Sequence, residues 1–376
     1  MVLESKKQME FNKLNITQLS AKDKPFVIAG PCSAESFSQV METATQLSKL
    51  GIKIFRAGIW KPRTKPGEFE GVGKIGLEWL KSAAAATGMI PAVEIATAQH
   101  VRQALSSGID IMWIGARTSA NPFAVQQIAD TLKKELSKPT KFKRELTILV
   151  KNPVNPDPEL WIGAMERIAL AGITQIGAVH RGFSSYEKGL MRNTPHWNIP
   201  IELKRRMPNL TILCDPSHIG GKRELVHPIS QNALDMGFDG LMIECHIDPD
   251  NALSDKYQQI TPAVLGQITN QLVLREDSEC QSALTELRRE IDEIDERIME
   301  LISKRMSISR EIGNYKKENN IPVLQPSRYH KMITRRVAQA SELMIDSDFI
   351  KLVLEAIHEE SVRQQLEHFN PHSQDG

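Results

Sequence analysis

The sequence predicts an α/β protein, a (β/α)8 TIM barrel followed by an all-α domain of three helices. Eight short apolar runs, most of them separated by helical patterns, occupy roughly the first 250 residues. Each run is continuous rather than alternating, which suits parallel strands that are buried on both faces. Beyond Arg275 the apolar residues recur at spacings of three and four, which is typical of a long helix. A doubly wound open sheet is the alternative, although no GxGxxG motif follows an early run.

The change of pattern near Arg275 also sets the expected domain boundaries. We expect a barrel domain over residues 1–275, a polar linker over 276–283 and a helical domain over 284–376. The 376 residues carry a formal net charge of +1, with 41% hydrophobic and 25% charged residues. These values are those of a soluble globular protein and favour neither nucleic acid nor a membrane as a partner. The four cysteines lack CxxC spacing, and no secretory signal precedes them, which favours a reduced, cytoplasmic setting.

The eight apolar runs give the expected barrel strands in chain order. They lie at residues 25–29, 52–59, 89–95, 109–114, 146–150, 173–179, 210–213 and 240–243. In such a barrel the chemistry gathers at the carboxyl ends of the strands. The residues at or just after those ends are Cys32, Arg56, Lys61, Arg117, Lys151, Arg181, His218 and Glu244. Independent loops would scatter charge at random, so this set predicts a single pocket.

Four side chains in this set and its neighbourhood predict a metal site. A thiol, an imidazole and two carboxylates suit a divalent transition ion, and they come from Cys32, His218, Glu244 and Asp255. Taken singly, each has an ordinary structural explanation: a small buried side chain, a loop histidine, an ion-pair partner and a helix cap. Their shared position at one rim favours the metal site.

The cations at the same rim predict an anion pocket. The stretch over residues 52–76 opens with a short buried strand, and the prolines and glycines that follow rule out a regular helix and favour a long loop. Arginines and lysines at the end of a buried strand can bind phosphate or carboxylate. One phosphate and one carboxylate could be held by Arg56, Lys61, Arg117, Lys151 and Arg181, and a second anion by Arg63 and Thr64. Two anionic substrates beside a divalent ion suggest a metal-assisted condensation.

At this point five motifs resemble those of 3-deoxy-D-arabino-heptulosonate 7-phosphate (DAHP) synthase, in its short-barrel, type I beta form. They are Gly30-Pro31-Cys32-Ser33, Lys61-Pro62-Arg63-Thr64, Ile114-Gly115-Ala116-Arg117, Asp215-Pro216-Ser217-His218 and Ile243-Glu244, and they follow the family's order over roughly residues 20–275. The resemblance implies condensation of phosphoenolpyruvate with erythrose 4-phosphate in the shikimate pathway. The sibling family that uses arabinose 5-phosphate normally lacks the Lys-Pro-Arg-Thr motif, so this motif favours the shorter sugar.

The resemblance also assigns roles to the residues of the rim. Phosphoenolpyruvate would be bound by Arg56, Lys61, Arg117, Lys151 and Arg181, and erythrose phosphate by Arg63 and Thr64. The metal, typically Mn2+, would be held by Cys32, His218, Glu244 and Asp255. Lys61 would donate a proton to the new alkoxide. We expect Cys32 and His218 to be essential for activity.

The last hundred residues predict one long helix and two shorter ones. Apolar residues at 284, 287, 291, 294, 298 and 301 form a seam that continues through 308 and 312, which predicts a helix over about 282–318. Two further helices are expected over 327–340 and 347–369. A helix this long in a small domain is expected to complete its core by dimerising. Arg305 stands in the apolar seam, where a cation needs an anionic partner.

This region, over about residues 280–370, resembles the all-helical chorismate mutase. Its binding residues match Arg288, Arg305, Lys316, Arg328, Ser361 and Gln365 in order. The resemblance implies rearrangement of chorismate to prephenate, with Arg305, Lys316 and Gln365 as the catalytic contacts. Because Arg288 and Arg305 point well apart on one helix, Arg288 would reach the site of the partner subunit.

Two positions depart from the chorismate mutase pattern. The family often has Asp three residues before, and Glu directly after, the arginine matched by Arg328, whereas this chain has Gln325 and Tyr329. One alternative is therefore a domain that only senses chorismate or prephenate and restrains the barrel. Another is a coiled seam whose polar residues set its register. Product binding to the helical domain would give feedback control in either enzymatic interpretation.

Overall fold

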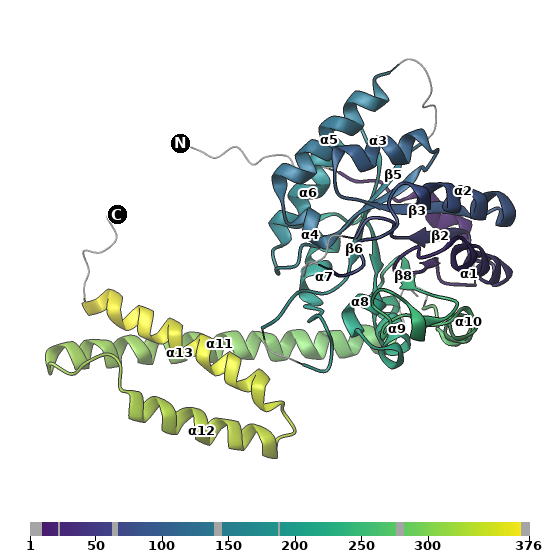
Figure 1. Ribbon diagram of the computed structural model, residues 1–376. Coiled ribbons are helices and arrows are strands. Elements are labelled where there is room, and N and C mark those ends of the chain that lie inside the picture. Colours follow the sequence, from purple (N-terminus) through teal and green to yellow (C-terminus); the bar gives the residue numbers. More distant parts are fainter. Residues whose placement is uncertain are drawn as a thin grey trace. The chain divides into compact units, whose positions relative to one another are not determined.

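A computed structural model describes the chain over residues 10–21, 23–61, 67–138, 145–186, 189–275 and 282–369 (Figure 1). The chain divides into two compact units, Met1–Glu276 and Asp277–Gly376. Each unit is built on its own secondary structure, and they are described separately below. Within the part of the chain that is described, no helix is both long enough and apolar enough to cross a membrane.

The first unit is a closed barrel of eight parallel strands that pair in sequence order (Figure 1). Pairing of β1 with β8 closes it, with Gly30 opposite Glu244. Every strand falls inside or within one residue of a predicted apolar run, which confirms the barrel and excludes the open sheet. The strands are β1 (Val27–Gly30), β2 (Ile54–Ala57), β3 (Ile90–Ile95), β4 (Ile111–Ile114), β5 (Thr147–Lys151), β6 (Gln175–His180), β7 (Thr211–Cys214) and β8 (Gly240–Glu244).

Helices surround the barrel, as Figure 1 shows. Several start at polar N-caps: the side chains of Ser36, Asn121, Asp157 and Thr261 each accept a hydrogen bond from a backbone N–H of the first turn. The α-helices are α1 (Phe37–Lys49), α2 (Ile75–Thr87), α3 (Ala98–Ser106), α4 (Ala116–Ser119), α5 (Pro122–Leu136), α6 (Pro158–Leu170), α7 (Asn198–Arg206), α8 (Pro216–Gly220), α9 (Val226–Asp235) and α10 (Pro262–Gln271). Three short 3-10 helices lie at η1 (Asn15–Leu19), η2 (Arg223–Leu225) and η3 (Pro249–Asn251).

Two apolar cores hold the barrel together. One lies between strands and helices, and the other fills the inside of the barrel with side chains such as Ile54, Trp113 and Met242. Leu14 belongs to the inner core, is 1% exposed, and donates its backbone N–H to Thr211 Oγ1 at 2.9 Å. Because Thr211 is the first residue of β7, Leu14 closes the end of the barrel at which the strands begin. The opposite end remains for binding and chemistry.

Over its described residues, 282–369, the second unit contains three helices, α11 (Ser282–Glu318), α12 (Pro326–Glu342) and α13 (Ser347–Phe369). The long helix begins and ends where the apolar seam predicts. Helix α13 packs along both α11 and α12. Much of the seam nevertheless faces solvent, since Leu287, Ile291 and Leu301 are 56%, 57% and 67% exposed.

Candidate active site

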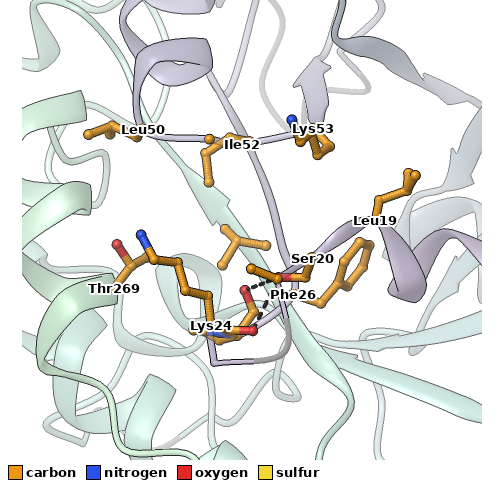
Figure 2. Close-up of a pocket in the computed structure, with 12 residues that line it drawn as sticks. Leu19, Ser20, Lys24, Phe26, Leu50, Ile52, Lys53 and Thr269 are labelled. Atoms are coloured by element: carbon orange, nitrogen blue, oxygen red, sulfur yellow. Dashed lines mark hydrogen bonds between the residues drawn. The ribbon is translucent and has the colours of Figure 1, made fainter.

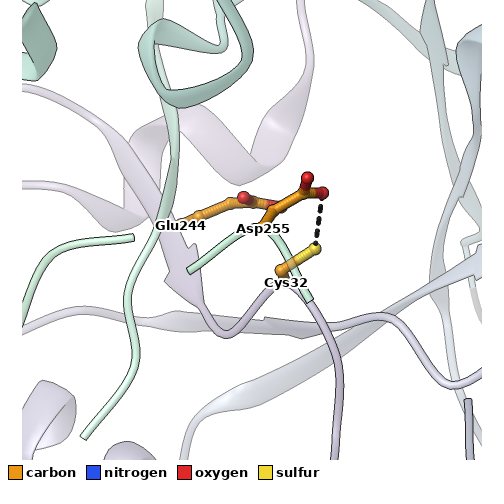
Figure 3. Close-up of side chains that lie close together, drawn as sticks. All are labelled: Cys32, Glu244 and Asp255. Atoms are coloured by element: carbon orange, nitrogen blue, oxygen red, sulfur yellow. Dashed lines mark hydrogen bonds between the residues drawn. The ribbon is translucent and has the colours of Figure 1, made fainter. Parts of the chain in front are cut away.

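Three of the four predicted metal ligands converge at the carboxyl end of the strands (Figure 3). The ligand atoms of Cys32, Glu244 and Asp255 all lie within 4.8 Å of one another, and Cys32 Sγ is 3.2 Å from Asp255 Oδ2. Cys32 and Glu244 are fully buried. Cys32 follows β1, Glu244 ends β8 and Asp255 lies in the loop after β8. Pairing of β1 with β8 therefore brings together residues separated by more than 200 positions in the sequence.

His218, the fourth predicted ligand, lies beside this cluster but outside the set of mutually close atoms. Its Nε2 is 3.7 Å from Glu244 Oε1, while its Nδ1 is 2.8 Å from Asp215 Oδ2. Asp215 also caps α8, because its Oδ1 accepts a hydrogen bond from the His218 backbone N–H at 3.0 Å. A carboxylate behind an imidazole fixes the ring so that its other nitrogen faces a metal. The geometry thus leaves Nε2 as the nitrogen turned toward Glu244.

The pKa values in the cluster reflect burial and opposite charges. Burial, together with the charge of Glu244, raises the pKa of the Cys32 thiol. Burial would raise the pKa of Asp255, but His218 and Arg192 hold it below the usual range of a carboxyl group. Burial likewise opposes ionisation of Glu244, and His218 and Arg56 nevertheless lower its pKa. A buried and a half-buried carboxylate, both ionised, form with the buried thiol a donor set that fits a divalent cation.

A cavity of about 240 Å³ opens beside this cluster and is lined by cations from several strands. Every described residue of the predicted phosphoenolpyruvate set lines it. Opposing them in the lining are two acids, Glu94 and Asp255. The cations are Arg56, Lys61, Arg117, Lys151, Arg181 and Arg192. Such an excess of positive charge in a hollow suits a polyanionic ligand.

Arg56 is the most deeply buried of these cations. Its side chain is 1% exposed, and Nη2 lies 3.2 Å from Glu244 Oε1. Its guanidinium also stands over the ring of Trp113, 4.8 Å from the centroid. Within the described part of the chain, the buried Nε and Nη1 atoms have no hydrogen-bond partner. Buried donors without partners are costly, so an anion that accepted from them would be strongly stabilised.

Lys151 and Arg181 are held in place by neighbours on the rim. Lys151 Nζ donates to Asp215 Oδ2 at 2.6 Å, so Asp215 links this lysine to His218. Arg181 Nη1 donates to Asn193 Oδ1 at 2.9 Å. Burial lowers the pKa of Arg181 to about 10, which still leaves it charged at neutral pH. Fixed cations of this kind need little reorganisation when an anion binds.

Lys61 and Cys32 both lie next to the backbone of Gly58. Burial would lower the pKa of Lys61, but the nearby Cys32 and Glu94 outweigh this effect and raise it. A Cβ at Gly58 would lie 2.6 Å from the Cys32 carbonyl oxygen and 2.9 Å from Lys61 Nζ. The Gly58 N–H also donates to that carbonyl at 3.2 Å. Only glycine therefore allows the end of β2 to approach the loop after β1 so closely.

Sequence reasoning missed several residues of this site. Arg192 donates to Asp255 Oδ1 at 2.8 Å and to Gln258 Oε1 at 2.6 Å, and Gln258 in turn donates to Glu244 Oε2 at 2.7 Å. Arg192 follows no apolar run, so nothing in the sequence around it indicates a role in the site. Glu94 could have been predicted, because a carboxylate inside the third apolar run is unusual. Arg63 and Thr64, predicted for the second anion, lie outside the described residues.

A separate hollow lies at the other end of the barrel (Figure 2). It has a volume of about 280 Å³ and is lined mainly by apolar side chains, among them Leu19, Phe26 and Ile52. It borders the starts of β1 and β2 and contains none of the predicted site residues. Its size does not make it the site of the chemistry, because its described lining residues include neither an ion pair nor a cysteine, histidine or carboxylate that could bind a metal.

The helical unit has a cavity of its own, of about 220 Å³. It contains five of the six residues matched to chorismate mutase: Arg305, Lys316, Arg328, Ser361 and Gln365. Arg305 Nη1 donates to Ser361 Oγ, and Lys316 Nζ donates to Gln365 Oε1 at 3.2 Å and to the Val323 carbonyl at 2.7 Å. Burial lowers the pKa values of both cations. The sixth residue, Arg288, is exposed on α11 and does not line this cavity.

These features define a (β/α)8-barrel protein whose pocket is lined by cations and borders a cluster of residues that could bind a metal. The chain continues into a helical domain with a second pocket suited to anions. Comparison with known families gives the same division. The profile of the DAHP synthetase I family matches residues 6–280, and that of chorismate mutase type II matches residues 287–366. The chain belongs to the DAHP synthetase I family and carries a C-terminal chorismate mutase type II domain.

Individual relatives match parts of the chain. Phospho-2-dehydro-3-deoxyheptonate aldolase of Thermotoga maritima is 38% identical over 234 residues, which are 62% of this chain and 64% of that protein. A crystal structure of this DAHP synthase from Thermotoga maritima superimposes with a TM-score of 0.60 at 31% identity, covering 70% of this chain and 72% of that one. The T-protein of Enterobacter agglomerans is 33% identical over 78 residues, which are 21% of each chain.

Proposed function

We propose that the barrel condenses phosphoenolpyruvate with erythrose 4-phosphate to give DAHP, and that the helical domain converts chorismate to prephenate. The proposed condensation rests on one observation: six cations line a cavity that lies beside the Cys32–Glu244–Asp255 cluster. The second part rests on the cavity that gathers Arg305, Lys316 and Gln365. Family membership supports both activities.

In the proposed condensation the cations hold the phosphate and carboxylate of phosphoenolpyruvate. Arg56 offers the N–H groups of its two unpartnered nitrogens, Nε and Nη1, and Lys151 and Arg181 neutralise further charge. This orients C3 of phosphoenolpyruvate toward the aldehyde carbon of the sugar, which Arg63 and Thr64 would bind through its phosphate. The new C–C bond turns the aldehyde oxygen into an alkoxide. Water adds at C2, and the C2–O bond to phosphate breaks.

Lys61 supplies the proton for the alkoxide. The raised pKa keeps its ammonium group protonated at neutral pH, which suits a proton donor. The cations that surround the cavity offset negative charge as it grows in a partly dry site. The proton is restored from solvent after product leaves.

We further propose that the barrel depends on a divalent metal, such as Mn2+, held by Cys32, His218, Glu244 and Asp255. The donor set supports this, because a thiol and two carboxylates that lie within 4.8 Å of one another are ligands that suit a divalent transition ion. A bound ion would supply Lewis acidity toward the aldehyde oxygen. The other steps use the residues of the chain as described above.

The helical site is proposed to act by holding its substrate in a reactive shape. Arg305 and Arg328 bind the two carboxylates, while Lys316 and Gln365 donate to the ether oxygen whose bond breaks. Arg288 would complete the site of a second copy. The exposed apolar seam of α11 supports at least a homodimer formed through this domain. A domain that only senses chorismate or prephenate is the second candidate, favoured by the lack of an acidic side chain in the described lining.

The test uses the full chain. Loss of phosphoenolpyruvate that requires both erythrose 4-phosphate and added Mn2+, and disappearance of chorismate with formation of prephenate, would support the two activities separately. Near-normal condensation in protein stripped of metal would remove the metal from the mechanism. Binding of prephenate without turnover of chorismate would favour the sensing domain.

A further inference from the structure

The cavity of the helical unit holds a pair of aromatic side chains to which the family resemblance gives no role. Tyr329 on α12 and His358 on α13 stack with ring centroids 4.4 Å apart and planes at 30°, and both line the cavity. Tyr329 directly follows Arg328, and His358 lies one helical turn before Ser361. The pair therefore stands among the residues proposed to hold the carboxylates.

His358 brings a buried polar atom to this cavity. Its Nε2 is buried and has no hydrogen-bond partner among the described residues. Burial, and then the charges of Arg305 and Lys316, lower the pKa of this imidazole, so it is neutral at pH 7. A neutral imidazole carries one N–H donor and one acceptor nitrogen. It can thus exchange hydrogen bonds with a hydroxyl group, which both donates and accepts.

The charged residues of the cavity leave the Tyr329–His358 pair to contact an uncharged part of the ligand. Three cations line the cavity, Arg305, Lys316 and Arg328, and no acid does so within the described residues. The anionic ends of a ligand will bind these cations. Gln325 and Tyr329 line the cavity, and no carboxylate does so among the described residues, so a hydroxyl group of the ligand can meet only neutral or cationic side chains here.

We propose that Tyr329 and His358 together, as a stacked pair in a cavity lined by cations, bind the ring hydroxyl of a dicarboxylate ligand. The proposal rests on the chorismate mutase function of this domain and deepens it by naming two specificity-determining residues. The stack fixes both rings against each other, which reduces the loss of side-chain freedom when the hydroxyl group binds. A neutral pair also leaves the cavity strongly positive, which favours tight binding of the dianion.

The test compares chorismate with its 4-deoxy analogue in the full-length protein. Tyr329→Phe and His358→Phe keep the aromatic stack but remove the polar atoms. Each is expected to weaken binding of chorismate and prephenate about five- to tenfold, the usual effect of one lost hydrogen bond, and to leave binding of the deoxy analogue unchanged. His358→Gln, which retains a donor and an acceptor, is expected to recover part of the preference for the hydroxyl group.

Matched controls come from the same unit, with Tyr315 on α11 and His330 on α12. Tyr315→Phe and His330→Phe change exposed residues that do not line the cavity, and should alter neither ligand's affinity. Equal losses for chorismate and the deoxy analogue, or no loss in either variant, would overturn the proposal. If instead the unaltered protein neither binds prephenate nor consumes chorismate, then the proposed function of the domain fails first.

Discussion

The barrel site and the helical site hold their cations in different environments. In the barrel, Arg56 and Lys151 are almost fully buried and each contacts a buried carboxylate, from Glu244 and Asp215. In the helical unit, the cations lie at a more open cavity, where they meet hydroxyl, carbonyl and amide oxygens. The barrel has a closed ring of strands to fix buried charges, whereas three helices offer less support. We infer that the barrel site is organised before its ligands arrive, and that the helical site needs its ligand and a second copy for completion.

The largest expected effect comes from removing a metal-type ligand of the barrel. Cys32→Ser and His218→Ala should each lower the condensation rate by at least about a hundredfold, because charge developing at the aldehyde oxygen loses its stabilisation. Chorismate turnover should stay unchanged, since it belongs to the other unit. Steady-state assays of both reactions on one preparation measure this. Cys214→Ala is the matched control, since Cys214 is buried outside the barrel interior and should keep its condensation rate.

A second prediction concerns completion of the helical site by a partner. Arg305→Ala and Arg288→Ala should each lower chorismate turnover about a hundredfold, because each removes a cation from the dianion. Mixing the two variants after subunit exchange should restore roughly a quarter of the normal turnover, since half the dimers are mixed and each of these has one intact site. Condensation should be unaffected throughout. Recovery would not occur if each chain used its own Arg288.

A third, smaller effect concerns the close approach of the Gly58 backbone to the loop after β1. Gly58→Ala should lower the free energy of unfolding by about 1–3 kcal/mol and impair condensation, because the new Cβ would press on the Cys32 carbonyl and the Lys61 amine. Gly163→Ala is the control: it lies within α6 with no atom within 4 Å of the added Cβ. That change should stabilise the barrel by about 0.5–1 kcal/mol. Urea unfolding of both variants gives the two values, and equal destabilisation would argue against the role of Gly58.

The fourth prediction is a pH dependence of barrel stability. His180 is enclosed by aromatic rings, including Trp161 and Phe183, and burial lowers its pKa to about 3. Between pH 3 and the value of about 6.5 for an unfolded chain, the unfolded state binds the extra proton. Stability should therefore fall as the pH drops below 6.5, by about 1.4 kcal/mol for each pH unit. His180→Phe should flatten this acid limb in thermal unfolding, and an unaltered slope would assign it to other groups.

Strand positions and the long helix could be read from the sequence because both depend on repeated apolar spacing. The barrel follows from eight runs, and α11 follows from one seam. Most of the described site residues also lie where strands end, so the pairing of the first strand with the eighth is enough to bring Cys32 close to Glu244. Arg192 and Gln258 could not be predicted, since they reach the site from loops whose course depends on tertiary packing. The stack of Tyr329 on His358 likewise joins two helices and has no local signal.

The central claim is that one mouth of the barrel combines the thiol of Cys32 with carboxylates and an imidazole around a single ion. Titration of metal-free, full-length protein with Co2+ tests it most directly, because a thiolate ligand produces a charge-transfer absorption. We predict a band that saturates at one ion per chain and is lost in Cys32→Ser but kept in Cys214→Ala. A band that survives in Cys32→Ser, or tight stoichiometric binding with no thiolate absorption, would contradict the account.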